Sequence, residues 1–527
     1  MNKNYFINIL KKNYHYIFFL IFFVIGLFSF KDYGISWDEK MSRGVGFLNG
    51  KYILENFFSE IYQKIIYANE NIKFDKLENY NLYNYPERAY GVSFELPMAL
   101  IEFISNIKDI DKVFLLRHFI TFTIFFISSI FFYKHLINLE YDKFTALIGF
   151  GILVTTPRIF AESFYNSKDI ILMSYMIISH YYGFKLIQKE KTSYLLLFSF
   201  FTALSAGLRI IGLANLFFYV LVLIYKKKKL NLYFNAKLLI STFLILYFIW
   251  PFLWEKPIEN FLFAIKFFSE VPWQGNKVFY LGNFFNSDNL PWHYTIVWML
   301  VTIPLVYIII FIFGVIKLFK KNNIFQFNIY YCYLVYLILP LALVILLKPI
   351  QIDGWRHFYF LYPVLIIMVL NIFNLIKNET KIFLKYVLII NIIYISIWNL
   401  YNHPHQYLYF NNLFSFKSIK YFEKDYWGLS NKKLIEEILK IDQSPKIYYK
   451  NYNSNFDASL DIFPRDISNK FNKINESENI NRYYIFINNR FFDETKIQSL
   501  IKETKIIKEF YFNNSFINGV YLKEIKN

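Results

Sequence analysis

Hydrophobic residues in this chain gather in long blocks that are separated by short polar segments. A helix needs about 20 apolar residues to cross the hydrocarbon core of a bilayer. Eleven blocks approach or exceed this length: residues 15–30, 114–134, 143–157, 169–187, 193–208, 210–225, 236–253, 294–318, 329–347, 358–376 and 384–400. The pattern predicts an all-α polytopic membrane protein with about eleven transmembrane helices.

A twelfth block, residues 92–107, is shorter and contains Glu95, Pro97 and Glu102. Cytoplasmic loops of membrane proteins are enriched in lysine and arginine. If this block does not cross, the lysine-bearing loops all fall on one side. The lysines are Lys3, Lys11, Lys12, Lys134, Lys143, Lys185, Lys189, Lys191, Lys226 to Lys229, Lys317, Lys320, Lys321, Lys377, Lys381 and Lys385. We therefore expect a cytoplasmic N-terminus that acts as an uncleaved signal anchor, and an outer C-terminus.

This topology divides the chain into a transmembrane domain, residues 1–401, and a small extracytoplasmic domain, residues 402–527. Four segments of the first domain face outward: a long loop over 31–113, a turn over 156–168, a loop over 254–293 and a turn over 348–357. The second domain shows helical spacing over 430–441 and strand-like runs at 446–450, 483–488 and 516–522. These patterns predict a small α/β domain.

Composition supports a membrane location and argues against nucleic acid as a partner. Hydrophobic residues make up 56% of the chain and the mean hydropathy is +0.30, which is too apolar for a soluble protein of this size. The net charge is +18, but the lysines follow the ends of hydrophobic blocks, as membrane topology requires. Cys332 is the single cysteine, so the chain forms no internal disulfide.

Three carboxylates on the expected outer face are candidates for proton chemistry. Asp38 and Glu39 follow the first hydrophobic block, and Asp169 begins the fourth. A carboxylate at a membrane surface can orient and deprotonate an incoming hydroxyl. A solvated loop could also carry such an acidic pair, and the helix dipole favours an acid in a first turn.

Several cations fall on the same face. Arg209 interrupts a long apolar stretch, and arginine near hydrocarbon usually faces a partner or an aqueous cavity. Arg356 and His357 stand beside aromatic residues, where they could bind phosphate or belong to an interfacial aromatic belt. Further candidates are Arg88, Arg158 and His293. A cationic cluster would hold a phosphate and stabilise it as it leaves.

On these residues the chain resembles the GT-C superfamily of integral-membrane glycosyltransferases. It is most similar to the branch of protein O-mannosyltransferases and lipid A aminoarabinose transferases. The resemblance covers roughly residues 1–430 through short motifs in a fixed order. They are Trp37–Glu39, the helix-opening acid after a proline-containing turn (Pro157 to Asp169), Gly207–Gly212, Leu290–Tyr294, Trp355–His357, Asn402–Asn411 and Phe422–Gly428.

The resemblance implies a GT-C-like fold and a hexosyl- or pentosyltransferase with a polyprenyl-phosphate-linked sugar as donor, usually inverting the anomeric carbon. It implies Asp38 as the base, with Glu39 beside it and Asp169 in support. The candidates for binding the donor phosphate are Arg88, Arg158, Arg209, His293, Arg356 and His357. The chain departs from the family at residues 85–88, where a cation followed by two prolines is common. Arg158 also lies farther from Asp169 than the family arginine lies from its acid.

The expected partners are the polyprenyl-phosphate sugar, a glycan, lipid or protein acceptor, and membrane lipids. No cofactor is firmly indicated. The chain has no His/Cys cluster with zinc spacing, whereas Mg²⁺ or Mn²⁺ at Asp38 and Asp169 stays open. The resemblance and the AT-rich residue usage indicate a bacterial inner (plasma) membrane with a periplasmic active site.

Two other functions stay open. A polysaccharide polymerase or ligase uses related chemistry at the outer face. An acceptor assay would distinguish it from the glycosyltransferase that the resemblance implies. A lipid or sugar transporter or flippase usually shows an internal repeat and charges near the membrane midplane, which this sequence lacks. In the C-terminal segment, Asp425, Tyr426 and Trp427 could serve the acceptor site or anchor domain packing.

Overall fold

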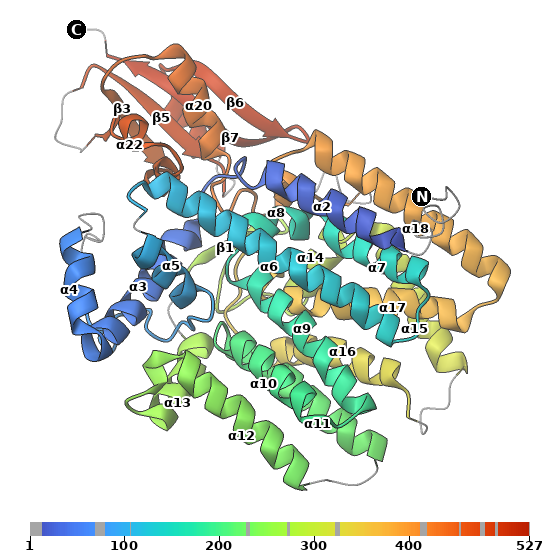
Figure 1. Cartoon of the computed structure of the whole chain (residues 1–527). Coiled ribbons are helices and arrows are strands. Elements are labelled where there is room, and N and C mark those ends of the chain that lie inside the picture. The colour runs from blue at the N-terminus through green and yellow to red at the C-terminus, as the bar shows by residue number, and fades with distance from the viewer. Residues whose placement is uncertain are drawn as a thin grey trace, which may run out of the picture.

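Long apolar helices make up most of the molecule, and a small β-sheet lies at one end of them (Figure 1). The computed structural model describes residues 13–68, 80–105, 107–227, 232–270, 275–321, 327–411, 419–452, 455–474, 480–490 and 494–525. Some lysines used for the topology prediction lie outside these residues: Lys3, Lys11, Lys12, Lys228 and Lys229.

Among the described residues, six helical segments are long and apolar enough to cross a membrane, and the number rises to eight if two bent pairs count as one span each. The six are α6 (Ile110–Asn138), α9 (Asp169–Gln188), α12 (Leu232–Ile249), α16 (Ile329–Leu347), η5 with α17 (Arg356–Leu361 and Tyr362–Leu375) and α18 (Asn378–Tyr401). Three shorter apolar helices are α2 (His15–Ser29), α10 (Thr192–Ala206) and η3 with α11 (Ile210–Leu213 and Ala214–Lys227). The chain is a multi-pass membrane protein, and a helix occupies each hydrophobic block.

The two bent pairs correct two sequence predictions. The block 294–318 was expected as one span, but α14 (Tyr294–Thr302) and α15 (Leu305–Lys321) meet at 117° around Pro304. The segment 156–168 was expected as a turn, but it contains α8 (Pro157–Tyr165), which meets α7 (Lys143–Thr155) at 64°. Proline lacks the backbone donor and restricts the residue before it, so it ends one helix and can open the next.

The expected loop over residues 31–113 is largely helical where it is described. It contains α3 (Trp37–Phe57), α4 (Ser59–Ala68) and α5 (Glu95–Ser105). Helix α5 has 11 residues, or about 16 Å of rise, which is too short to cross the hydrocarbon core. Block 92–107 is therefore not a span by itself.

The segment over 254–293 also carries secondary structure. A short 3₁₀ helix, η4 (Pro251–Leu253), precedes α13 (Pro257–Glu270). A two-stranded antiparallel hairpin follows, with β1 (Lys277–Tyr280) paired to β2 (Asn283–Asn286).

The C-terminal region forms a five-stranded mixed sheet with strand order β4-β3-β5-β7-β6. The strands are β3 (Ile447–Tyr452), β4 (Phe471–Lys473), β5 (Arg482–Asn488), β6 (Lys505–Phe512) and β7 (Ser515–Glu524). Strand β3 runs parallel to β4 and β5, whereas β7 runs antiparallel to β5 and β6. The helices of this region are α20 (Asn431–Ile441), α21 (Phe456–Ser459), α22 (Arg465–Ser468) and α23 (Glu494–Ile501). The predicted helix and three predicted strands are confirmed as α20, β3, β5 and β7.

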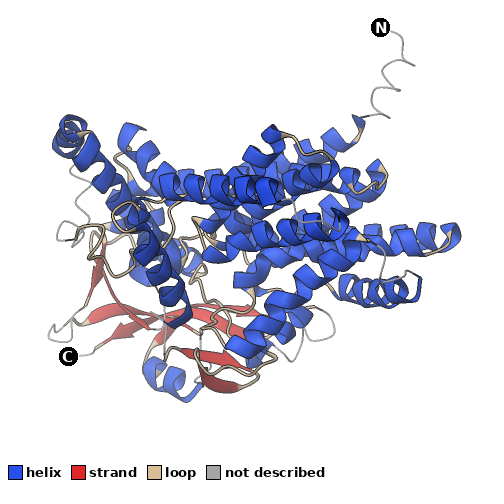
Figure 2. Cartoon of the chain, turned by 90° about the horizontal axis from the view of Figure 1, so that it is seen from below, coloured by secondary structure: helices blue, strands red, loops and turns tan. Residues whose placement is uncertain are grey.

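The sheet domain docks on the end of the helical part where the segment 31–113 begins. Lys40 contacts Asp461 at 3.0 Å, and Ile35 and Phe114 belong to the hydrophobic core of the sheet domain. Figure 2 shows the strands gathered on one side of the helical body. We call this the sheet end of the molecule. Asp38 and the C-terminal domain therefore share one side.

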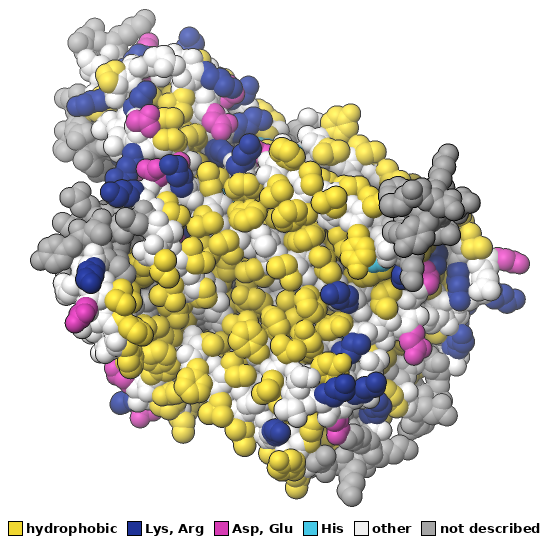
Figure 3. Space-filling model, in the orientation of Figure 1, with side chains coloured by type: hydrophobic (Ala, Val, Ile, Leu, Met, Phe, Trp, Pro, Cys, Tyr) yellow, Lys and Arg dark blue, Asp and Glu magenta, His cyan; other side chains and the backbone are white. Residues whose placement is uncertain are grey.

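The surface between the two ends is apolar. Figure 3 shows a broad hydrophobic band across the helices, with charged side chains over the sheet domain and at the opposite end. Large hydrophobic side chains are exposed on the membrane helices, for example Leu20 and Phe28 on α2 and Phe248 on α12. A continuous exposed apolar surface of this kind suits contact with lipid rather than water.

Candidate functional site

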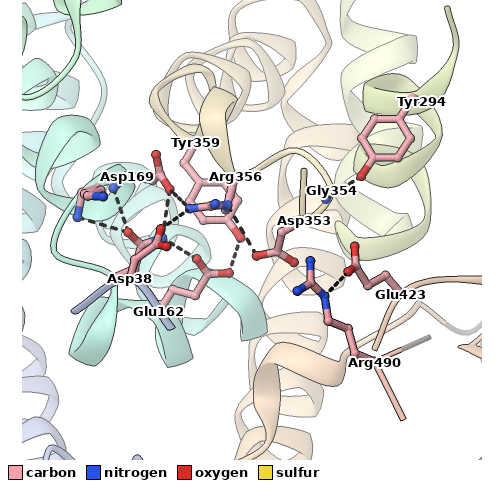
Figure 4. A network of polar contacts seen from close by, with 12 residues as sticks. Asp38, Glu162, Asp169, Tyr294, Asp353, Gly354, Arg356, Tyr359, Glu423 and Arg490 are labelled. Carbon is pink, nitrogen blue, oxygen red and sulfur yellow. Dashed lines mark hydrogen bonds and ion pairs between the residues drawn. The ribbon is translucent and has the colours of Figure 1, made fainter. Parts of the chain in front are cut away.

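A cavity of about 310 Å³ lies at the sheet end, where η5, the turn before η3 and the start of α3 meet. Its lining has a polar part and an apolar part. The polar part consists of Asp38, Lys168, Arg209, Gln351, Arg356 and His357. Figure 4 shows Asp38, Asp169 and Arg356 pointing toward one another. Four candidate residues from distant parts of the sequence, Asp38, Arg209, Arg356 and His357, thus line one cavity, and a fifth, Asp169, contacts Arg209 and Arg356.

Asp38 reaches the cavity because α3 begins beside it. Ser36 and Glu39 form a capping box, in which each side chain accepts a hydrogen bond from the other residue's backbone N–H. This arrangement fixes the first turn of α3 and leaves Asp38 directed at Arg356, whose Nη1 donates to Asp38 Oδ2 at 3.2 Å. The Asp38 side chain keeps 13% of its surface exposed, so it is accessible from the cavity.

Asp169 lies deeper and opens α9. Its backbone N–H donates to Asn166 Oδ1 at 2.8 Å, which fixes the entry to the helix. The carboxylate accepts from Arg356 Nη1 at 3.0 Å and pairs with Arg209 Nη2 at 2.9 Å. Its side chain is 1% exposed. Asp169 therefore holds two arginines in place rather than facing the cavity itself.

Arg209 is positioned by a tight turn with glycine at both ends. A Cβ on Gly212 would overlap the backbone of Ser205, and a Cβ on Gly91 would overlap the carbonyl of Gly207. Ser93 N donates to Gly207 O at 3.2 Å. This close approach ties the segment around Gly91 and Ser93 to the turn that carries Arg209. A side chain at Gly91 would force the two apart, and a side chain at Gly212 would distort the turn itself.

Arg356 is the centre of the charge cluster. Its side chain is 3% exposed and bridges Asp38 and Asp169. The guanidinium also lies 4.7 Å from the ring centre of Trp427 and 5.3 Å from that of Tyr426. Stacking on aromatic faces suits arginine and fixes the plane of its donors. Residues after the last membrane helix thus form one wall of the site.

The positive charges nearby control the ionisation of Asp38. Burial, with a contribution from Asp169, raises the pKa of this carboxyl, but Lys168, Arg356 and Arg209 together outweigh that effect. The net pKa lies below the ordinary value of 3.8, so Asp38 carries a negative charge at neutral pH.

The remaining lining of the cavity is apolar and leads away from the charges. It includes Ile210 and Ile211 from η3, and Pro340, Leu343, Val344 and Leu347 from α16. Leu343 and Leu347 are exposed on the surface of the helical part. The cavity therefore joins a cationic centre to the hydrophobic exterior of the helices, which is the shape expected for an amphiphilic anion.

A second polar network lies behind Arg356. Asp353 Oδ2 is 3.6 Å from Arg356 Nε, Tyr359 donates to Glu162, and Arg490 from the sheet domain pairs with Glu423 (Figure 4). Burial is the main cause that raises the pKa of Asp353 to about 7, and Arg356 opposes it. This network connects the C-terminal domain to the cavity without lining it.

Besides Asp169, four of the predicted residues do not line the cavity. Glu39 is buried, caps α3 and contacts His118 Nε2 at 2.9 Å. The other three are Arg88, over the ring of Phe263 at 4.5 Å; Arg158, over Trp298 at 4.9 Å; and His293, whose Nδ1 lies 2.6 Å from Tyr280 OH. Aromatic or hydrogen-bonding partners satisfy these groups away from the cavity.

Sequence reasoning missed two contributions to the site. Lys168 lines the cavity, and its position directly before Asp169 was the signal that could have indicated it. The aromatic wall of Tyr426 and Trp427 was noted only as a choice between an acceptor site and a packing anchor. The third residue of that run, Asp425, is buried and accepts hydrogen bonds from the backbone of Leu429 and Ser430, so it anchors the chain.

The carboxylates fit a divalent cation poorly in this arrangement. Arg356 Nη1 lies within 3.2 Å of Asp38 and 3.0 Å of Asp169, where a bridging ion would be placed. Arg209 occupies the other side of Asp169 at 2.9 Å. Within the described residues, no group of three or more His, Cys, Asp or Glu side chains is arranged to hold a metal.

Comparison with known proteins gives similarity in structure alone. No protein-family model matches the chain, and no curated protein sequence matches it. The chain is similar to ArnT from Cupriavidus metallidurans bound to undecaprenyl phosphate, with a TM-score of 0.49 and 8% identity over 96% of this chain and 97% of that chain. For ArnT from the same organism in the apo state, the TM-score is 0.42 and the identity 9%, over 78% of this chain and 86% of that chain. Such values assign no residue and no activity, so the function must follow from the site itself.

Proposed function

We propose that the protein is a membrane glycosyltransferase that takes a sugar from a polyprenyl-phosphate-linked donor and transfers it to an acceptor hydroxyl at the outer face of the membrane. The observation that carries the proposal is the single cavity in which Asp38 lies beside Lys168, Arg209, Arg356 and His357 and which continues into an apolar wall. A carboxylate next to a phosphate-binding cluster is the minimum such a transfer needs.

The donor phosphate binds at the cationic part, and its hydrocarbon chain lies along Leu343, Val344 and Leu347. Three cations, Lys168, Arg209 and Arg356, face the carboxylates Asp38 and Asp169. Asp353, 3.6 Å from Arg356, adds only part of a negative charge, because burial raises its pKa to about 7. The centre therefore keeps an excess of positive charge for an anion. Arginine offers paired donors to phosphate oxygens. Arg356, when it turns a donor to the phosphate, releases Asp38 from its ion pair.

The reaction is a direct displacement at the anomeric carbon. The acceptor oxygen forms a bond to that carbon while the bond to the phosphate oxygen breaks, and its electron pair leaves with the polyprenyl phosphate. Asp38 accepts the proton of the acceptor hydroxyl. Lys168, Arg209 and Arg356 stabilise the charge that develops on the leaving phosphate. Attack opposite the leaving group inverts the anomeric configuration.

The test is turnover of a panel of polyprenyl-phosphate sugars by the purified protein and by Asp38→Asn in parallel. Loss of a positioned base costs about 10²- to 10⁴-fold in rate. Binding of the donor is expected to persist in Asp38→Asn, because the cations stay and one competing carboxylate loses its charge. Parallel reactions with EDTA, Mg²⁺ or Mn²⁺ report any dependence on metal.

Other outcomes would redirect the proposal. Full activity in Asp38→Asn would remove this residue as the base. Binding of the donor without turnover, with candidate acceptors present, would favour a transporter or flippase. Extension of a glycan chain, rather than transfer of one sugar, would favour a polymerase or ligase.

A further inference from the structure

A second cavity lies at the end of the helices opposite the sheet end. It has a volume of about 560 Å³ and is lined by side chains of α2, α6 and α9 and by Lys143 at the start of α7. His15, which lines this cavity, begins α2, and Ser29 ends that helix. Shortly after Ser29, Asp32 contacts His403 at the sheet end. His15 and Ser29 lie about 21 Å apart along the axis of α2. The cavity is therefore distinct from the candidate active site.

Two buried side chains that line this cavity each have a polar atom without a hydrogen-bond partner among the described residues. The atoms are Nδ1 of His15 and the hydroxyl of Tyr133. His15 is 7% exposed and Tyr133 is 5% exposed, and their ring centres lie 5.2 Å apart in a stacked arrangement. Buried polar groups in folded proteins almost always have a partner. The cavity therefore has a polar side that the protein itself leaves unsatisfied.

The charged residues of the lining indicate whether the polar side of the cavity suits an anion or a cation. Lys134 and Lys143 line the cavity, and no acidic residue does. The nearest acid along the chain, Asp142, is engaged by Lys385 Nζ at 3.0 Å and by the backbone of Thr145 at 3.0 Å. The polar part of the cavity is therefore suited to an anion.

Most of the remaining lining is apolar and reaches the exposed surface of α2. Phe19, Leu20, Phe23, Phe126 and Ile130 form this wall. Leu20 is 62% exposed. A ligand that fills the cavity must combine an anionic head with apolar chains.

We propose that this cavity binds one anionic phospholipid, with the lipid phosphate beside Lys134 and Lys143, on the side of the cavity that His15 and Tyr133 line. The acyl chains lie against α2 and α6. Basic pockets between membrane helices are suited to anionic headgroups. The site would fasten α2, a helix of 15 residues that is short for a span, to the helices behind it. The proposal does not depend on the proposed enzymatic function.

The experiment is native mass spectrometry of the delipidated full chain in detergent, titrated with phosphatidylglycerol or phosphatidylcholine. Each lysine near an anionic lipid contributes about fivefold in affinity. The double variant Lys134→Gln/Lys143→Gln is expected to weaken phosphatidylglycerol binding by about 25-fold and to leave phosphatidylcholine unchanged. Leu20→Trp, at an exposed position of the wall, should block the same binding without altering charge. The matched control is Lys317→Gln/Lys320→Gln, which removes two lysines at the end of α15.

Three results would overturn the proposal. The first is equal affinity of the wild type for the two lipids. The second is an equal loss in the control variant, which would reflect net charge alone. The third is unchanged phosphatidylglycerol binding in Leu20→Trp. Displacement of the lipid by millimolar inorganic phosphate would assign the site to a free anion instead.

Discussion

Two adjacent carboxylates take opposite roles at the site. Asp38 and Glu39 look equivalent in the sequence, yet Glu39 caps α3 and contacts His118, whereas Asp38 faces Arg356 and the cavity. Successive residues of a helix point about 100° apart, so only one of the pair can face the cavity. The capping requirement of Ser36 decides which one, because the third residue of the helix must turn back to the N-cap.

The lowered pKa of Asp38 leads to a prediction about pH. A carboxyl whose pKa lies below 3.8 stays ionised as the pH falls from 7 to 5. If Asp38 is the base, kcat/KM is expected to stay level over that range and to fall only below about pH 4. The measurement is the pH profile of donor turnover in the wild type. An acidic limb that centres near pH 6 or 7 would assign the base to another group.

Much of the charged centre could be predicted from single residues, and the candidates that lie away from it share one feature. Asp38, Asp169, Arg209, Arg356 and His357 lie near the predicted outer ends of hydrophobic blocks. Arg88, Arg158 and His293 share that pattern, but each finds an aromatic or hydroxyl partner in three dimensions. The position of a cation in the sequence indicates how deep it lies in the membrane, but it does not indicate which side chain lies beside it in the fold.

At the scale of elements, the apolar blocks predicted where the helices lie but not where they bend. Every predicted block is occupied by a helix, because length and hydropathy are local properties. The bends at Pro157 and Pro304 reach 64° and 117°, and the angle depends on what the broken helix packs against. The helices within residues 31–113 were missed because they are not hydrophobic enough to be read as spans.

The turn that carries Arg209 gives a prediction at this scale. Gly91→Ala places a Cβ against the carbonyl of Gly207, which is backbone and cannot rotate away. We expect Arg209 to shift and donor turnover to fall by about 100-fold, as small misplacements of catalytic geometry do. The measurement is the turnover rate together with the melting temperature.

A matched control is Gly151→Ala on α7. Its Cβ would lie 3.2 Å from Ile392 Cδ1, the end of a flexible side chain, so activity is expected to stay near that of the wild type. If both variants lose activity to the same extent, the loss reflects general helix packing. In that case the Gly91–Gly207 contact has no particular role.

At the scale of the whole molecule, the two ends of the helical part differ in the residues that they carry. The sheet end carries the C-terminal domain, the candidate active site and most of the buried arginines, whereas the opposite end carries the lysines of the helix-connecting loops. Contacts such as Lys40 with Asp461 and His403 with Asp32 fix the domain and the site on one side. This relation supports the predicted sidedness, although which side faces the cytoplasm stays a prediction.

That prediction can be tested with cysteine labelling. Cys332 is the single native cysteine, so Cys332→Ser provides a background without thiols. Lys502→Cys adds an exposed thiol in the C-terminal domain, and Lys320→Cys adds one near the C-terminal end of α15. A membrane-impermeant maleimide is expected to label the first in intact cells and the second only after permeabilisation, because lysine-rich loops stay in the cytoplasm. The reverse pattern would place the lysine loops outside and the Asp38 cavity on the cytoplasmic side. The sugar donor would then have to be presented from the cytoplasm, and the outer-face transfer proposed above would be wrong.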